Sequence, residues 1–133
     1  MSILIDTNVL LRYILSDDPI DSPKARAVFR SLTRQEPGWI GIGTVFEMVW
    51  VLFQVKKMGR EPVSKALTEL LLLDTIVFEQ DSIFASALLR FRTTKADLAD
   101  CMIAASAKAA GCSKTLTFDR IAARDAGMEL IPS

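Results

Sequence analysis

The chain has 133 residues, half of them hydrophobic, and its sixteen Lys and Arg residues balance sixteen Asp and Glu residues. This length and apolar content predict one domain, residues 1–133, with a hydrophobic core of its own. The zero net charge argues against a protein that coats nucleic acid through charge alone, although a few local cations could still contact phosphates. The first residues lack the pattern of a signal peptide, which predicts a cytoplasmic protein.

The chain contains no histidine. Histidine is the usual general base near neutral pH and the usual activator of serine or cysteine, so the common catalytic triads are excluded. Cys101 and Cys112 lack the CxxC spacing of a zinc site and are predicted to be small core residues. A hydrolase built from this chain would depend on carboxylates, and carboxylates favour hard cations such as Mg²⁺ or Mn²⁺.

The first predicted element is a buried strand, Ile3–Ile5, which ends on Asp6. Ligands of open α/β sheets bind at the carboxyl ends of the strands, so an acid in this position is a candidate for catalysis. Asp6 can also cap the helix expected over residues 9–15, and this purely structural role is the alternative.

The next segments are expected to be a loop, a helix and a second strand. Asp17 and Asp18 precede Pro19 and are interpreted as turn residues. A helix is predicted from Asp21 to about Thr33, followed by a short buried strand over residues 39–42.

A helix over residues 44–53 is apolar on nearly every side and is therefore predicted to be buried on nearly every side. Glu47 is its only ionisable residue. Burying an isolated carboxylate costs on the order of several kcal/mol, so Glu47 needs a cation, either an arginine or a metal, or a gap open to solvent. Its position one turn after the second strand should bring it near Asp6.

Lys56, Lys57 and Arg60 end this helix, either as solvated capping charges or as contacts to phosphates. Three further elements are predicted from apolar periodicity and strand propensity: a helix over 62–73, a strand over 74–78 and a helix from 81 or 82 to about 91.

A second acidic centre lies at the start of a helix expected to run to about Ala110. Asp97 and Asp100 are three residues apart, which places both carboxylates on one helix face within about 5–6 Å. Such a pair repels itself unless a cation lies between them. Asp97 could instead be the N-cap, so Asp100 is predicted to be the principal metal ligand and Asp97 a helper.

Residues 115–118 repeat the opening pattern of a short apolar strand that ends on an acid, Asp119. Arg120 and Arg124 follow on a helical turn, and residues 128–131 form a last strand. Alternating strands and helices predict an α/β fold, a three-layer α/β/α sandwich with a mainly parallel central sheet. Asp6, Glu47, Asp100 and Asp119 would then gather at one edge, where their mutual repulsion implies a bound divalent metal.

The ordered motifs Ile5–Asn8, Glu47 in an apolar helix, Asp97–Asp100 before Met102–Ala105, and Thr117–Arg120 resemble those of PIN-domain nucleases of the VapC toxin group. The resemblance spans essentially the whole chain. It implies a compact α/β/α ribonuclease that uses Mg²⁺ or Mn²⁺, acts as a homodimer and is silenced by a small VapB-like antitoxin protein. It assigns Asp6, Glu47, Asp100 and Asp119 as the catalytic acids and metal ligands, with Asn8 and Thr117 as supporting polar groups.

The function predicted from the sequence is therefore metal-dependent hydrolysis of RNA phosphodiester bonds by a toxin. RNA would be held by local cations, with these candidates: Arg12, Lys56, Lys57, Arg60, Arg92 and Arg120. Two alternatives remain. A catalytically silent interaction module would use the acids only to receive a partner's arginines, and a phosphatase of the haloacid dehalogenase kind would use Asp6 as a covalent nucleophile. That phosphatase normally has a second acid two residues later, where this chain has Asn8.

Overall fold

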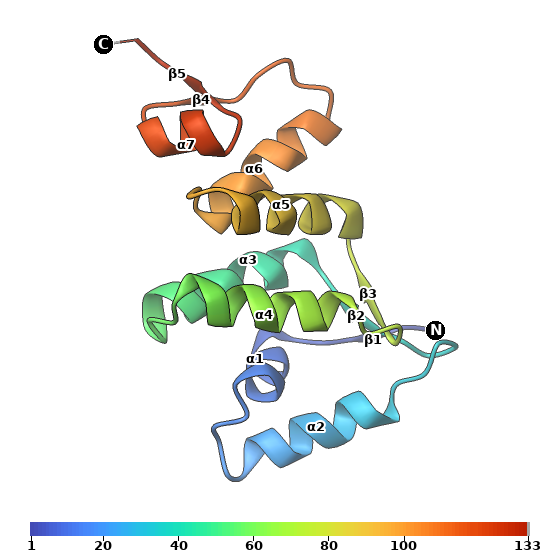
Figure 1. The fold of residues 1–133 in the computed structure, drawn as a ribbon. Helices are drawn as coiled ribbons and strands as arrows, with labels where there is room; N and C mark the ends of the chain where they lie inside the picture. Colours follow the sequence, from blue (N-terminus) through green and yellow to red (C-terminus); the bar gives the residue numbers. More distant parts are fainter. Residues whose placement is uncertain (133) are drawn as a thin grey trace. The chain divides into compact units, whose positions relative to one another are not determined.

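The computed structural model describes residues 1–132, which form two compact units, Met1–Glu79 and Gln80–Ser133 (Figure 1). The elements of the first unit are β1 (Ile3–Leu4), α1 (Thr7–Leu15), α2 (Asp21–Ser31), β2 (Gly38–Ile40), α3 (Ile42–Trp50), the π-helix η1 (Val51–Val55), α4 (Arg60–Leu71) and β3 (Ile76–Phe78). Those of the second are α5 (Asp81–Thr93), α6 (Leu98–Ala109), β4 (Leu116–Thr117), α7 (Arg120–Asp125) and β5 (Glu129–Leu130).

The first unit is built on a parallel three-stranded sheet in the order β1-β2-β3. Leu4 pairs with Trp39, and Ile40 pairs with Phe78. By this register Asp6, Gly41 and Glu79, which follow the three strands, reach the same level at the carboxyl edge of the sheet. Helices α1 and α2 pack together, and α1 also packs against α3.

The prediction that the first strand is buried was wrong for two of its three residues. Ile3 is 38% exposed and Leu4 is 67% exposed, and only Ile5, just after the strand, is buried. Edge position alone is not the reason, because Ile76 and Phe78 of β3, the other edge strand, are buried; the faces of the sheet at Ile3 and Leu4 are left open to solvent.

The prediction that the helix around Glu47 is buried on nearly every side was also wrong. Val45, Met48 and Val49 are buried in the core, whereas Glu47 and Trp50 are exposed. The α-helix ends at Trp50 and continues as the π-helix η1. Nothing in the apolar pattern distinguished the inner face of this helix from the outer one.

The second unit pairs α5 with α6 most extensively, and its strands β4 and β5 form a parallel two-stranded sheet. The core of this unit contains Phe84, Leu88, Phe91, Leu98 and Met102. Cys101 is buried as predicted, but Cys112 is exposed because it lies beyond the end of α6, so its prediction as a core residue was wrong.

The predicted elements are confirmed in type and order, with shifts of a few residues at their ends. All strand pairs among residues 1–132 are parallel, as expected for alternating strands and helices. Asp17 and Asp18 lie in the loop before α2, as interpreted from Pro19. None of the helices within residues 1–132 is long and apolar enough to span a bilayer.

Candidate functional site

Asp6 lies between the end of β1 and the start of α1 and is exposed. Its Oδ1 accepts a hydrogen bond from the Thr7 backbone N–H at 2.8 Å, so Asp6 is the N-cap of α1. Asp6 therefore has the structural role of a helix cap. This role occupies one carboxylate oxygen and leaves Oδ2 available, so capping does not exclude metal binding. Asn8, the predicted supporting residue, lies exposed in the first turn of the same helix.

Glu47 lies in the middle of α3, and its side chain is exposed to solvent. The sequence left open an arginine, a metal or a gap open to solvent as the partner of Glu47. The structure shows that Glu47 is open to solvent. Glu47 can therefore receive a cation from solution.

Asp97 and Asp100 lie at the start of α6. Asp97 is the N-cap, and its Oδ1 accepts a hydrogen bond from the Asp100 backbone N–H at 3.2 Å. Asp100 is partly buried. Burial raises the pKa of the Asp100 carboxyl, and the negative charges of Asp97 and Asp119 raise it further. The like-charge crowding predicted from their spacing is thus present, and a third acid, Asp119, adds to it.

Asp119 follows β4 and caps α7. Its Oδ1 accepts hydrogen bonds from the backbone N–H groups of Ile121 at 2.8 Å and Ala122 at 3.0 Å. The Asp119 backbone N–H donates to Thr117 Oγ1 at 3.0 Å. Thr117 therefore holds the backbone of Asp119, and its role as a supporting group of an active site stays a prediction.

None of the candidate acids is paired with a cation within residues 1–132, whereas several other carboxylates are. Within residues 1–132, none of the following forms an ion pair with a lysine or arginine: Asp6, Glu47, Asp97, Asp100 and Asp119. By contrast, three of the other carboxylates form ion pairs of 2.6 to 3.9 Å between a carboxylate oxygen and a side-chain nitrogen: Asp17 Oδ2 with Lys56 Nζ at 3.9 Å, Asp74 Oδ2 with Arg34 Nη2 at 2.6 Å, and Asp125 Oδ1 with Arg124 Nε at 2.9 Å. The candidates are thus not already neutralised by cations of their own chain.

The structure brings Asp97, Asp100 and Asp119 into electrostatic contact within the second unit, and it places Asp6 and Glu47 in the first unit. No three acidic, histidine or cysteine side chains of residues 1–132 converge in an arrangement ready to hold a metal ion. The gathering of all four predicted catalytic acids stays a prediction.

The chemistry of this donor set fits Mg²⁺ or Mn²⁺. All five candidates offer carboxylate oxygens, the ligands that hard divalent cations prefer. The pKa of Asp100 is raised first by burial and then by the negative charges of Asp97 and Asp119, and a divalent cation would relieve that repulsion.

We expect Asp100→Asn to raise the melting temperature of the metal-free protein at pH 7. Its raised pKa means that ionised Asp100 is less favourable in the folded than in the unfolded chain, so it destabilises the fold above that pKa. Below the unfolded value of about 3.9 both states are protonated and the penalty is lost. The gain should therefore shrink as the pH falls from 7 toward 4. Thermal unfolding in EDTA measures the difference in melting temperature between the two proteins. A lower melting temperature for Asp100→Asn than for the wild type at pH 7 would contradict the view that ionised Asp100 destabilises the fold.

Glu79 is a site residue that the sequence did not single out. It follows β3, and its Oε1 accepts a hydrogen bond from the Ile42 backbone N–H at 2.9 Å. Gly41, at the N-cap position of α3, has no side chain with which to cap the helix. Glu79 supplies the cap instead, 37 residues away in sequence, and so orients the helix that carries Glu47. The only available signal was a strand ending on an acid, Phe78–Glu79, as in Ile5–Asp6.

Replacing Glu79 with alanine should lower the free energy of unfolding by about 1 kcal/mol, the usual cost of losing an N-cap. Glu79→Gln keeps a side-chain oxygen as acceptor and should lose less than half as much. Urea unfolding of the three proteins measures both effects. Equal stability of Glu79→Ala and the wild type would show that this bond does not hold the start of α3.

Comparison with known families adds an observation that is independent of this geometry. Residues 3–127 match the sequence model of the PIN domain, which covers both units. The match confirms the predicted fold class, helices with a parallel sheet of the PIN type. No curated protein is significantly similar to the chain.

Proposed function

Because the chain belongs to the PIN domain family, we propose that it is an endoribonuclease that depends on Mg²⁺ or Mn²⁺ and acts as a VapC-type toxin. PIN domains are generally nucleases that use divalent metal ions, and this membership is the observation that carries the proposal. We further propose that residues 1–133 act as one nuclease domain, in the cytoplasm, as a homodimer controlled by a VapB-like antitoxin.

The proposed catalytic residues and metal ligands are Asp6, Glu47, Asp100 and Asp119, with Asp97 as an additional metal ligand. Asn8 and Thr117 are the supporting polar groups. Two features support this set. These acids have no ion pair within residues 1–132, and the pKa of Asp100 is raised by burial and, beyond that, by the charges of Asp97 and Asp119.

The carboxylates have defined tasks in this proposal. A divalent metal, when bound, supplies a more acidic water and stabilises negative charge on the phosphate oxygens. The helix caps at Asp6 and Asp119 fix the direction of each carboxylate, so that its second oxygen is oriented before any cation binds. Thr117 keeps Asp119 in place through its backbone N–H.

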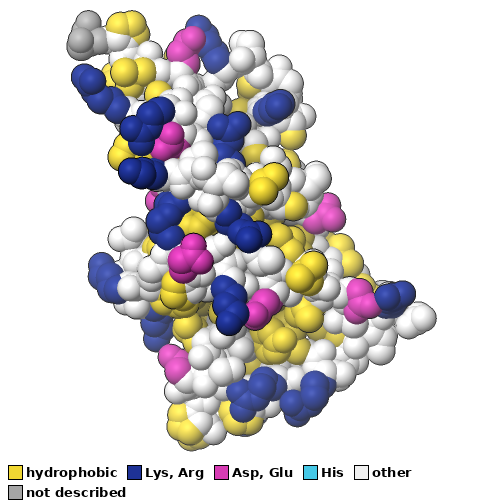
Figure 2. Space-filling model, viewed as in Figure 1, with side chains coloured by type: hydrophobic (Ala, Val, Ile, Leu, Met, Phe, Trp, Pro, Cys, Tyr) yellow, Lys and Arg dark blue, Asp and Glu magenta, His cyan; other side chains and the backbone are white. Residues whose placement is uncertain are grey.

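The structure narrows the set of cations that could hold RNA. Arg12 Nη1 lies 3.7 Å from Asp18 Oδ2, and Lys56 Nζ lies 3.9 Å from Asp17 Oδ2. The positive charges of Arg12 and Lys56 are therefore partly neutralised. Lys57, Arg92 and Arg120 form no ion pair within residues 1–132 and are the better candidates. On the face shown in Figure 2, Lys and Arg side chains are interspersed with Asp and Glu side chains, which fits contact through a few local cations.

Induced expression in bacteria tests the toxin function. We expect the wild-type protein to arrest growth and Asp6→Asn, expressed to the same level, to allow normal growth. Immunoblots of both cultures check that the two proteins are expressed to the same level. Arrest by both proteins would mean that any toxicity does not depend on the acidic site, and growth with both would argue against a toxin.

A further inference from the structure

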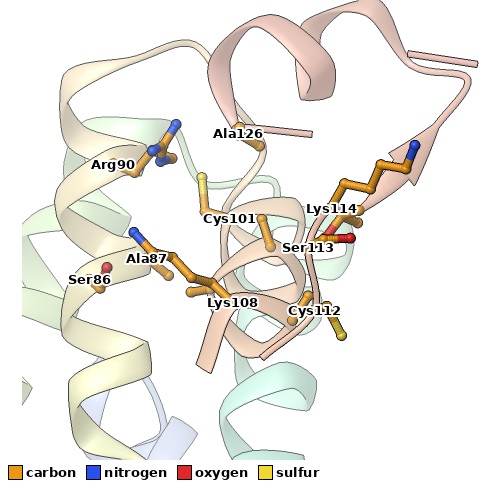
Figure 3. A pocket seen from close by; sticks show the side chains of 14 residues that line it. Ser86, Ala87, Arg90, Cys101, Lys108, Cys112, Ser113, Lys114 and Ala126 are labelled. Carbon is orange, nitrogen blue, oxygen red and sulfur yellow. The ribbon is translucent and has the colours of Figure 1, made fainter. Parts of the chain in front are cut away.

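A pocket of the second unit is lined by side chains of α5 and α6 and of the segments that follow them, and no acidic residue lines it (Figure 3). Its volume is about 370 Å³, and it lies between α5, one face of α6, the segment before β4 and the segment after α7. From Asp100 to Lys108 the axial rise of α6 is about 12 Å. The pocket runs along α6 from Cys101, which directly follows Asp100, to Lys108 near the carboxyl end of the helix.

The charged groups of this pocket are all cationic. Arg90, Lys108 and Lys114 line it, and no Asp or Glu does. Lys114 is neutralised by Glu129, with Nζ and Oε2 3.0 Å apart, and in Figure 3 it extends away from α5. Arg90 and Lys108 form no ion pair with any carboxylate of residues 1–132. Two positive charges are thus left for an anion.

The Arg90 guanidinium is held in place by backbone. Its Nη1 donates to the Asp125 carbonyl oxygen at 3.2 Å. Gly127, with φ of +77°, leaves room for it, because a Cβ at this position would lie 3.2 Å from the same nitrogen. The remaining N–H groups are free to bind a ligand. Ser86 lies one turn earlier on the same face of α5 and adds a hydroxyl.

Part of the lining is made of small, weakly polar or apolar side chains, called the floor below: Ala87, Cys101, Ala104, Ala105, Ala107 and Ala126. Such a surface offers little to a free inorganic ion but accepts a flat ring. Lys108 extends across it from α6 toward α5 (Figure 3). A ligand with one phosphate and one flat apolar group matches both parts of the pocket.

We propose that this pocket binds a nucleotide, with its phosphate on Arg90 and Lys108 and its base against the floor. Arginine and lysine are the usual phosphate ligands of proteins, and the arginine here is oriented in advance. The ligand is either a free mononucleotide or the phosphorylated end of an RNA chain, which share this chemistry. The site goes beyond the proposed nuclease function and does not require it.

Isothermal titration of the full chain in EDTA with 5′-AMP, 5′-UMP, adenosine and inorganic phosphate tests this assignment. EDTA removes any metal contribution from the acidic residues. We expect the two nucleotides to bind and adenosine to bind at least about tenfold more weakly, because it lacks the phosphate. Alkylation of the exposed Cys112, which also lines the pocket, should slow when 5′-AMP is present.

Three variants make the test specific. Lys108→Gln removes one phosphate ligand and should weaken 5′-AMP about tenfold. Ala104→Leu fills the floor and should weaken 5′-AMP while leaving inorganic phosphate unchanged. Lys65→Gln removes an exposed cation of α4 outside the pocket and should change neither.

A short RNA with a 5′-phosphate separates the two sources of the ligand. Competition by this RNA, but not by the same RNA without the phosphate, assigns the pocket to RNA ends, and binding of mononucleotides alone assigns it to free nucleotides. No binding of 5′-AMP at millimolar concentration would overturn the proposal. So would binding that is unchanged by both Lys108→Gln and Ala104→Leu.

Discussion

Replacing Asp6 with asparagine will reduce RNA cleavage by the purified protein roughly 100-fold or more. Losing an outer-shell partner of a metal ligand typically costs about 10–100-fold, so loss of a direct ligand should cost at least the upper value. Asparagine keeps a side-chain oxygen that can accept the Thr7 N–H, so the cap of α1 should survive. The measurement is the initial rate of cleavage of a labelled RNA with saturating Mn²⁺.

The stability of this variant separates a catalytic role from a structural one. Without metal, Asp6→Asn should be as stable as the wild type or more stable, because one negative charge is removed from the proposed acidic set. Asp18→Asn is the matched control, since Asp18 also accepts backbone N–H groups at the start of a helix, from Ile20 and Asp21, and should keep its activity. A drop of several degrees for Asp6→Asn without metal would favour a purely structural cap.

Chelation of divalent ions will abolish cleavage, and Mn²⁺ or Mg²⁺ added back will restore it. The chain has no histidine that could act as general base without a metal, and its candidate acids are not neutralised by its own cations. We expect cleavage to fall to the background of an RNA-only control in EDTA. Excess Mn²⁺ should recover most of the initial rate.

Asp6→Asn, purified in parallel, is the control for contaminating ribonucleases in this experiment. Cleavage that persists in EDTA would exclude the proposed metal-dependent chemistry. A protein that cleaves no RNA with any added metal would favour the silent interaction module, in which the acids only receive a partner's basic side chains.

Local chemistry in the sequence predicted the elements and several of the individual roles. The Asp97 cap, the turn at Asp18 and the buried faces of α4 and α5 all follow from contacts within a few residues, which a linear sequence displays directly. The crowding of Asp97 and Asp100 follows from helix geometry in the same way.

Other features depended on which segments pack together, and these only the tertiary structure decided. The exposure of Leu4 depends on which parts of the sheet faces are covered by other elements, because a covered strand and an uncovered one can carry the same apolar sequence. The exposed side of α3, where Glu47 lies, depends on which helices pack against it, and hydropathy alone cannot tell one apolar face from another. The Glu79 cap joins positions 37 residues apart, and only the register between β2 and β3 brings them together. By itself, the sequence determined the PIN-type order of elements, because that order follows from the order of the residues. It also determined that no histidine is available for catalysis, because this depends on composition alone.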